Sequence, residues 1–231
     1  MGRVGNNPVP PGEGRRDPSP CRKKRTAIVS IHYHIGDLPD GLSFANGVAI
    51  DTETMGLNLQ RDRLCVVQLS AGDGDAHVVH FPQADFRAPR LRALLADQRV
   101  QKLFHYARFD LAMIQRHFGI VCAPVYCTKV ASKLVRTNTD RHGLKDLCRD
   151  LLAVELSKQQ QTSDWGAPAL SDEQIAYAAS DVLYLHALRH KLNDLLDREG
   201  RRPLAEACFS FLPIRAALDL AGWQEEDIFA H

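Results

Sequence analysis

The first half of the chain alternates apolar and polar positions with a period of two, which is the spacing of a β-strand. Alternating or β-branched runs separated by turn residues predict strands at 28–35, 47–54, 64–69 and 76–80. Asp73 and Gly74, directly before the last of these runs, are typical of a hairpin turn. Because the strands follow one another through short connections, the pattern predicts an antiparallel or mixed sheet.

The second half of the chain changes to a period of about 3.6 residues, which predicts helices. Helices are expected at 90–97, 107–118, 142–152, 171–198 and 203–220, with a break at Pro213 in the last and a short strand at 101–105. Ser171 followed by Gln174 is the pattern of a capping box, and Gly119 is placed to end the second helix. A sheet with helices packed on it predicts a single α/β domain over residues 28–231.

The composition is that of an ordinary globular protein, with 45% hydrophobic and 25% charged residues in a chain of 231. The net charge of +1 is unevenly spread, because residues 1–27 hold seven basic and two acidic side chains, or +5. The rest of the chain therefore carries −4. Gly, Pro and the basic residues make 1–27 a predicted disordered leader. An acidic domain argues against binding to long duplexes and leaves open a metal site made of carboxylates.

The six cysteines are scattered, without a CxxC pair, so the sequence predicts neither a disulfide framework nor a structural zinc site. No apolar run approaches the roughly 18 residues that a membrane span requires. We therefore expect a cytoplasmic protein that does not bind a membrane.

Two carboxylates follow a buried strand at 48–50. Asp51 and Glu53 are two positions apart, so an extended backbone places both on the same face of the strand. Like charges this close repel and are usually held by a cation or a shared proton. Taken alone, the pair also fits a solvated strand edge.

Three further polar residues lie on predicted helices. Asp110 stands in the first turns after the strand at 101–105, where the helix dipole by itself also favours a carboxylate. Tyr177 and Asp181 are four residues apart and share one helix face, so a structural hydrogen bond between them is the alternative to a functional pair.

Together these segments resemble the DEDD superfamily of 3′-to-5′ exonucleases, and the tyrosine before the last acid is similar to its DEDDy branch, which includes ribonuclease D. The resemblance rests on residues 48–57 (VAIDTETMGL), 105–110 and 177–185 (YAASDVLYL). Residues 139–145, 157–165 and 208–231 are further similar to the nano-RNase C (NrnC) group, small bacterial enzymes that degrade very short RNA. The resemblance implies a ribonuclease H-like exonuclease domain, a mixed sheet flanked by helices.

The resemblance also implies a chemistry, the hydrolysis of short RNA from its 3′ end with two divalent ions, Mg²⁺ or Mn²⁺. Asp51, Glu53, Asp110 and Asp181 are the expected metal ligands, with Asp51 bridging both ions. Tyr177 is expected to orient, and to help deprotonate, the attacking water. Because an unperturbed phenol has a pKa of about 10, activity should climb toward alkaline pH.

A second set of residues is expected to contact the substrate: Thr52, Leu57, His105, Arg141, His142, Lys145, Lys158, Gln159 and Trp165. Leu57 is either an apolar wedge between the last two bases or a core leucine. His105 either touches the terminal sugar or is a buried structural histidine. The basic residues at 141–145 either bind a phosphate or form a solvated face.

The expected partners are short RNA oligonucleotides and further copies of the chain, an octameric ring being implied by the resemblance. The apolar residues of the last helix fit either a subunit interface or packing within the monomer. Two other functions stay open. One is a broader, ribonuclease D-like exonuclease that trims longer RNA or DNA, and the other is an inactive exonuclease fold that only binds nucleic acid.

Overall fold

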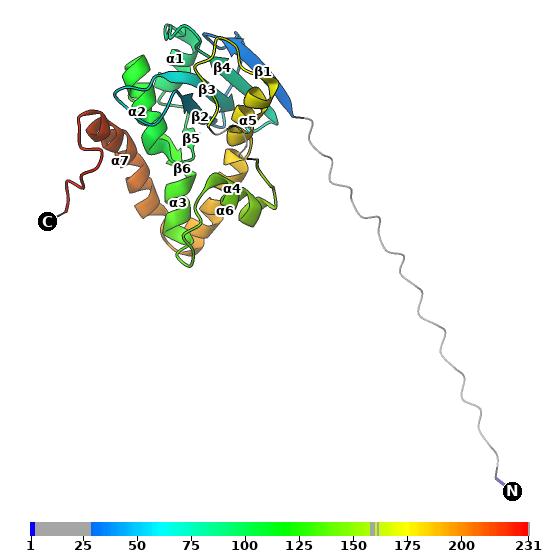
Figure 1. Cartoon of the computed structure of the whole chain (residues 1–231). Coiled ribbons are helices and arrows are strands. Elements are labelled where there is room, and N and C mark those ends of the chain that lie inside the picture. The colour runs from blue at the N-terminus through cyan, green and yellow to red at the C-terminus, as the bar shows by residue number, and fades with distance from the viewer. Residues whose placement is uncertain (3–28, 158–159, 161, 231) are drawn as a thin grey trace.

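The computed structural model describes residues 1–2, 29–157, 160 and 162–230, and Figure 1 shows a central sheet flanked by helices. The predicted leader at 1–27 therefore lies, after its first two residues, outside the described part of the chain. Lys158 and Gln159 lie outside it as well. Within the described residues, no helix is both long and apolar enough to cross a membrane.

In the described part of the chain, six strands form one mixed sheet in the order β1-β4-β3-β2-β5-β6. Their bounds are β1 Ser30–Ile35, β2 Val48–Thr54, β3 Leu64–Ser70, β4 Asp75–His80, β5 Lys102–Phe104 and β6 Val125–Cys127. β2 pairs antiparallel with β3 and parallel with β5, which in turn pairs parallel with β6. The mixed sheet confirms the expected fold class.

The helices follow the first four strands, as predicted, and β5 and β6 lie between the first of them. They are α1 Pro89–Ala96, α2 Ala107–Phe118, α3 Thr128–Val135, α4 Leu144–Leu147, the π-helical turn η1 Cys148–Leu152, α5 Asp172–Leu183, α6 Leu185–Arg198 and α7 Arg202–Leu220. Ser171 and Gln174 form the predicted capping box at the start of α5. Gly119 ends α2 in the left-handed conformation, with φ 66°.

Several elements differ from the predictions, including the helix at 142–152, which is divided into α4 and the π-helical turn η1. β6 and α3 were not predicted. β6 has only three residues and α3 begins directly after it, so no turn residue marks where the strand pattern ends and the helix pattern begins. The predicted helix at 171–198 is divided at Tyr184, whose φ of −105° departs from helical geometry. The predicted break at Pro213 is wrong, since α7 continues through this residue. The missing N–H leaves one carbonyl without a helical donor but does not end the helix.

The core lies on the sheet, where all seven residues of β3 are buried. α5 packs across β2, β3 and β4, while α2 packs against β2, β3, β5 and β6. These two helices carry Asp181 and Asp110, so the packing of apolar faces on the sheet brings both acids toward β2.

Candidate active site

The centre of the site is a group of three carboxylates that we call the acid cluster, Asp51, Glu53 and Asp181. One carboxylate oxygen from each lies within 4.8 Å of the others. The first two project from one face of β2, and α5 supplies the third. Residues 130 positions apart in the chain thus meet because α5 packs on β2.

The fourth predicted acid, Asp110, lies beside this cluster and is held separately. Its side chain is buried in the first turn of α2 and accepts a 2.6 Å hydrogen bond from Thr52 Oγ1. Thr52, expected to contact substrate, is buried in β2 and orients this carboxylate. Asp110 is nevertheless close enough for its charge to raise the pKa of Asp51 and of Glu53.

All four acids are difficult to ionise in this arrangement. Burial, followed by the neighbouring carboxylates, raises the pKa of Asp51 well above its usual range and that of Glu53 to about 9. Burial also raises the pKa values of Asp110 and Asp181 to about 7 each. No Lys or Arg forms an ion pair with any of them in the described part of the chain.

This donor set fits a hard divalent cation. Carboxylate oxygens are the ligands that Mg²⁺ and Mn²⁺ prefer, and a cation would relieve the repulsion that raises these pKa values. Histidine and cysteine, which favour softer metals, are absent from the acid cluster. The site is therefore suited to magnesium or manganese rather than to a structural zinc ion.

Tyr177 lies one helical turn before Asp181 on α5 and hydrogen-bonds to its carboxylate. Burial and the surrounding carboxylates raise the pKa of the phenol well above 10. Trp165 packs against the phenol, with ring centroids 6.1 Å apart, and is 2% exposed. Trp165 therefore supports Tyr177 from the protein interior, although the sequence suggested a substrate contact.

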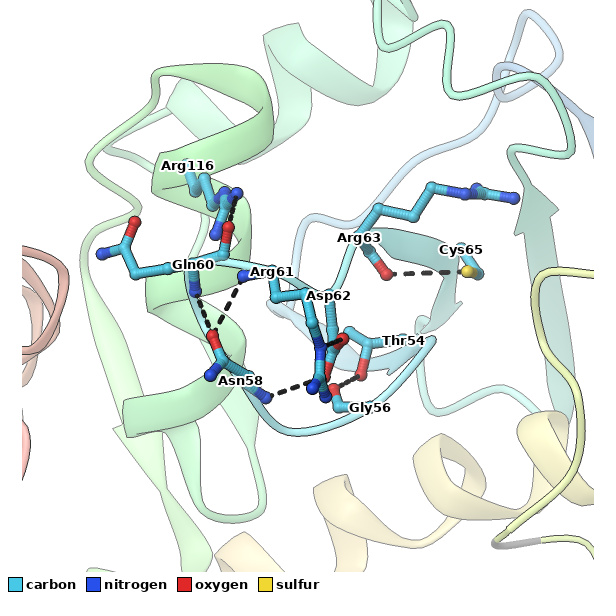
Figure 2. Close-up of polar contacts among 9 residues, drawn as sticks. All are labelled: Thr54, Gly56, Asn58, Gln60, Arg61, Asp62, Arg63, Cys65 and Arg116. Atoms are coloured by element: carbon cyan, nitrogen blue, oxygen red, sulfur yellow. Dashed lines mark hydrogen bonds and ion pairs between the residues drawn. The ribbon is translucent and has the colours of Figure 1, made fainter.

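The loop after β2 presents the predicted wedge. Leu57 is 77% exposed, so the alternative of a core leucine is wrong. Figure 2 shows that the loop is held by its own polar groups. Asp62 Oδ2 accepts a 2.9 Å bond from the Asn58 amide, and Thr54 Oγ1 donates to the Gly56 carbonyl at 2.5 Å. A side chain at Gly56 would collide with Asp62.

The other predicted contacts lie on neighbouring elements. His105 follows β5, with Nδ1 2.9 Å from Thr128 Oγ1, and burial lowers its pKa to about 3, so the ring is neutral. His142 is buried, with Nδ1 2.8 Å from Ser132 Oγ, whereas Arg141 is exposed and Lys145 half-buried. These basic residues therefore do not form one solvated face.

Two kinds of residue at the site escaped the sequence reasoning. Gln68 is fully buried on β3 opposite Asp51 and donates to its carboxylate at 3.4 Å. The sequence feature that could have identified Gln68 is its polar side chain inside the apolar run at 64–69. Asn58 and Asp62 shape the loop that carries Leu57, and their turn-forming side chains were a weaker one.

The sequence of the chain is similar to those of known exonucleases. A family model described as 3′-5′ exonuclease matches residues 34–197. Ribonuclease D of Acidiphilium cryptum is 38% identical over 184 residues, 80% of this chain and 46% of that protein. Ribonuclease D of Gluconacetobacter diazotrophicus is 38% identical over 67% of this chain and 39% of its own length. The chain thus spans less than half the length of these relatives.

Solved structures of similar size match over their full length. Brucella melitensis NrnC bound to pGG is 55% identical, with a TM-score of 0.84 over 88% of this chain and 100% of that chain. The same protein with bound Mg²⁺ is 55% identical, with a TM-score of 0.83 over the same shares. Escherichia coli RNase D, at 24% identity and a TM-score of 0.65 over 74% of this chain and 44% of its own, shares the fold.

Proposed function

Because the chain belongs to the ribonuclease D-like branch of the 3′-5′ exonuclease family, we propose that it is a metal-dependent 3′-to-5′ exoribonuclease. Its substrates are short RNA oligonucleotides, dinucleotides above all, and its products are 5′-mononucleotides. The observation that carries the proposal is the acid cluster on β2 and α5, with Asp110 and Tyr177 beside it.

The carboxylates supply the metal site of this reaction. Asp51, Glu53 and Asp181 would hold two divalent ions together with Asp110, and Asp51 would contact both. When bound, such ions supply a nucleophilic water and neutralise charge on the phosphate and the leaving oxygen. Similarity to the Mg²⁺-bound Brucella NrnC structure supports magnesium, and manganese has the same preference for oxygen ligands.

Three other side chains are assigned to the attacking water and to the substrate. Burial raises the pKa of the Tyr177 phenol, so the hydroxyl holds its proton near neutral pH before metal binds, and we assign it the orientation of the attacking water. Leu57, exposed on its loop, separates the last two bases, where stacking contributes about 1–3 kcal/mol per base. The neutral ring of His105 faces the terminal sugar as an uncharged hydrogen-bonding group.

Similarity to the pGG complex of Brucella NrnC, over the full length of that protein, supports a short RNA substrate. The ribonuclease D relatives favour instead a broader, ribonuclease D-like exonuclease. Self-association to an octameric ring and a cytoplasmic location also belong to the proposal. Exposed Ile214 and Phe229 near the carboxyl end support self-association, whereas Phe209 and Leu212 of the same region are buried.

A length series tests this function. Labelled RNA and DNA of two to about ten nucleotides are incubated with the full chain in Mg²⁺ or Mn²⁺, and kcat/KM is measured for each. We expect RNA dinucleotides to be strongly preferred, and Asp181→Asn to lose about 10³-fold or more in kcat. Equal rates on dinucleotides and longer RNA would favour the broader exonuclease. Wild-type protein that binds RNA but cleaves none would indicate the inactive fold.

A further inference from the structure

The strands β2, β5 and β6 run parallel, so their carboxyl ends lie at the same end of the sheet. β2 brings the acid cluster there, β5 is followed by His105 and Tyr106, and β6 is followed by Thr128 and Lys129. The 2.9 Å contact between His105 Nδ1 and Thr128 Oγ1 joins the last two segments. Because ligands of open α/β sheets bind at the carboxyl ends of strands, we expect all three segments to border the same site.

Tyr106 occupies an unusual backbone conformation at this edge. Its φ of 65° and ψ of 45° are left-handed, which is rare for an aromatic residue, and its side chain is 48% exposed. Such strain persists only where the surroundings hold it, and it gathers at ligand-binding sites. The strained backbone places the ring under Lys129, whose ammonium nitrogen lies 4.0 Å from the ring centroid.

Lys129 lies in surroundings that are unfavourable for a cation. It belongs to the first turn of α3, where the helix dipole repels positive charge and no acidic residue is present. Lys133, one turn later, repels it further. Burial and this neighbour lower the pKa of Lys129. Across residues 29–157, 160 and 162–230, no carboxylate lies within ion-pair distance of its ammonium group.

The ring of Tyr106 contacts this charge directly and the Cys127 thiol also favours it, but a cation–π contact is weaker than an ion pair with a desolvated anion. A partly buried ammonium group without a counter-ion is suited to binding an anionic ligand. The ligand expected beside the acid cluster is a nucleotide, whose phosphate is such an anion. Lysine binds phosphate as a point charge and does not need the planar geometry of arginine.

We infer that Lys129, held over the ring of Tyr106, binds a non-bridging phosphate oxygen of the substrate next to the acid cluster. This subsite rests on the proposed function, because that function brings a phosphate to the edge of the sheet. Lys129 is the substrate-binding residue, and Tyr106 is a positioning residue that acts through it. A 5′-phosphorylated dinucleotide offers two such phosphates, the phosphodiester and the 5′-terminal group.

The test compares Lys129→Met, which keeps an unbranched side chain without the charge, with Lys129→Arg and the matched control Lys133→Met. KM and kcat are measured on dinucleotides with a 5′-phosphate and with a 5′-hydroxyl. Lys129→Met should raise KM about tenfold and flatten its dependence on salt, while Lys129→Arg recovers most of the loss. An effect confined to the 5′-phosphorylated substrate identifies the terminal phosphate, and an effect on both identifies the phosphodiester.

Two variants test the role of Tyr106. Tyr106→Phe retains the aromatic ring and should keep KM within about twofold, whereas Tyr106→Leu should raise KM in the same direction as Lys129→Met. Unchanged KM in Lys129→Met, or an equal rise in Lys133→Met, would overturn the subsite. Melting temperatures establish that each variant is folded.

Calorimetric binding of a 5′-mononucleotide in Mg²⁺ needs no turnover and separates the two proposals. Weaker binding by Lys129→Met, in a protein whose wild type cleaves no dinucleotide, supports the subsite and contradicts the proposed function. Cleavage by the wild type, with Lys129→Met binding and cleaving equally well, supports the function and contradicts the subsite.

Discussion

At the scale of single residues, the chemistry depends on how Tyr177 is surrounded. Its hydroxyl hydrogen-bonds to Asp181, and its ring packs on the buried Trp165. Burial, followed by the surrounding carboxylates, raises the pKa of the phenol and keeps it protonated near neutral pH in the metal-free protein. A protonated phenol can donate to one group while accepting from a water, so orientation is the role that its environment supports.

Removing this hydroxyl gives the first prediction. Tyr177→Phe should lower kcat by about 10²-fold or more and leave KM and magnesium binding near wild type, because the ring and its packing on Trp165 are retained. Steady-state kinetics across pH and a magnesium titration provide the measurement. Full activity in the variant would contradict any role for the hydroxyl. If the wild-type rate rises toward alkaline pH and this slope vanishes in the variant, the phenol also acts as a base.

At the scale of elements, polar contacts within the loop at 55–63 hold the apolar side chain of Leu57 exposed to solvent. Asn58 Oδ1 accepts from the amides of Gln60 and Arg61, and Asp62 accepts from the amide of Asn58 (Figure 2). Arg116 on α2 also donates to the Gln60 carbonyl, which ties the loop to the helix of Asp110. A rigid loop reduces the entropy that is lost when Leu57 meets a base.

A double-mutant cycle tests this loop. Leu57→Ala should lower kcat/KM on a dinucleotide about tenfold by removing the stacking surface. Asp62→Ala should lower it in the same direction, because the Asn58 amide loses its acceptor and Leu57 is no longer held. If both act through Leu57, the double variant should be little worse than Leu57→Ala alone.

The matched control is Asp85→Ala, which removes an exposed aspartate paired with Arg87 on another loop. Its kcat/KM should equal that of wild type, and melting temperatures should show that Asp62→Ala is folded. Fully additive losses in the double variant would show that Asp62 does not act through Leu57.

At the scale of the whole molecule, the acid cluster links metal binding to stability. In the folded protein the pKa values of all four carboxyl groups are raised, so the acids stay protonated to higher pH. In the unfolded chain the same groups ionise with a pKa of about 4. The native state therefore binds more protons than the unfolded state, and stability falls as the pH rises. Divalent ions bind the ionised carboxylates and should reverse this loss.

The window for this prediction lies between about pH 7 and about pH 8, above the pKa of about 6.5 of an unfolded-state histidine and below the pKa of about 8.5 of an unfolded-state thiol. In this window, the metal-free protein should lose roughly 1–2 kcal/mol of unfolding free energy, to which Glu53, with a pKa of about 9, contributes strongly. Urea unfolding at several pH values measures the slope.

Two comparisons control this experiment. Glu53→Gln removes one raised carboxyl group and should flatten the slope, and saturating Mg²⁺ should stabilise the wild type more at the upper end of the window. A slope that is identical in wild type and Glu53→Gln would contradict the proposed link between this acid and stability.

The sequence by itself determined the strands of the first half, most helices and the order of the five central site residues. These features depend on local periodicity and on neighbours in the chain, as in Asp51 and Glu53 on one strand face or the capping box at Ser171. The family motifs that they form are likewise read directly from the order of residues. The sheet type and the family followed from them.

Only the tertiary structure decided which residues meet and which are buried. A three-residue strand such as β6 has too few positions to show a period, and its identity comes from pairing with β5. Burial of Trp165, exposure of Leu57 and the contact between Tyr106 and Lys129 depend on segments distant in the chain. Long-range packing fixes these distances, because residue type alone does not set the environment of a side chain.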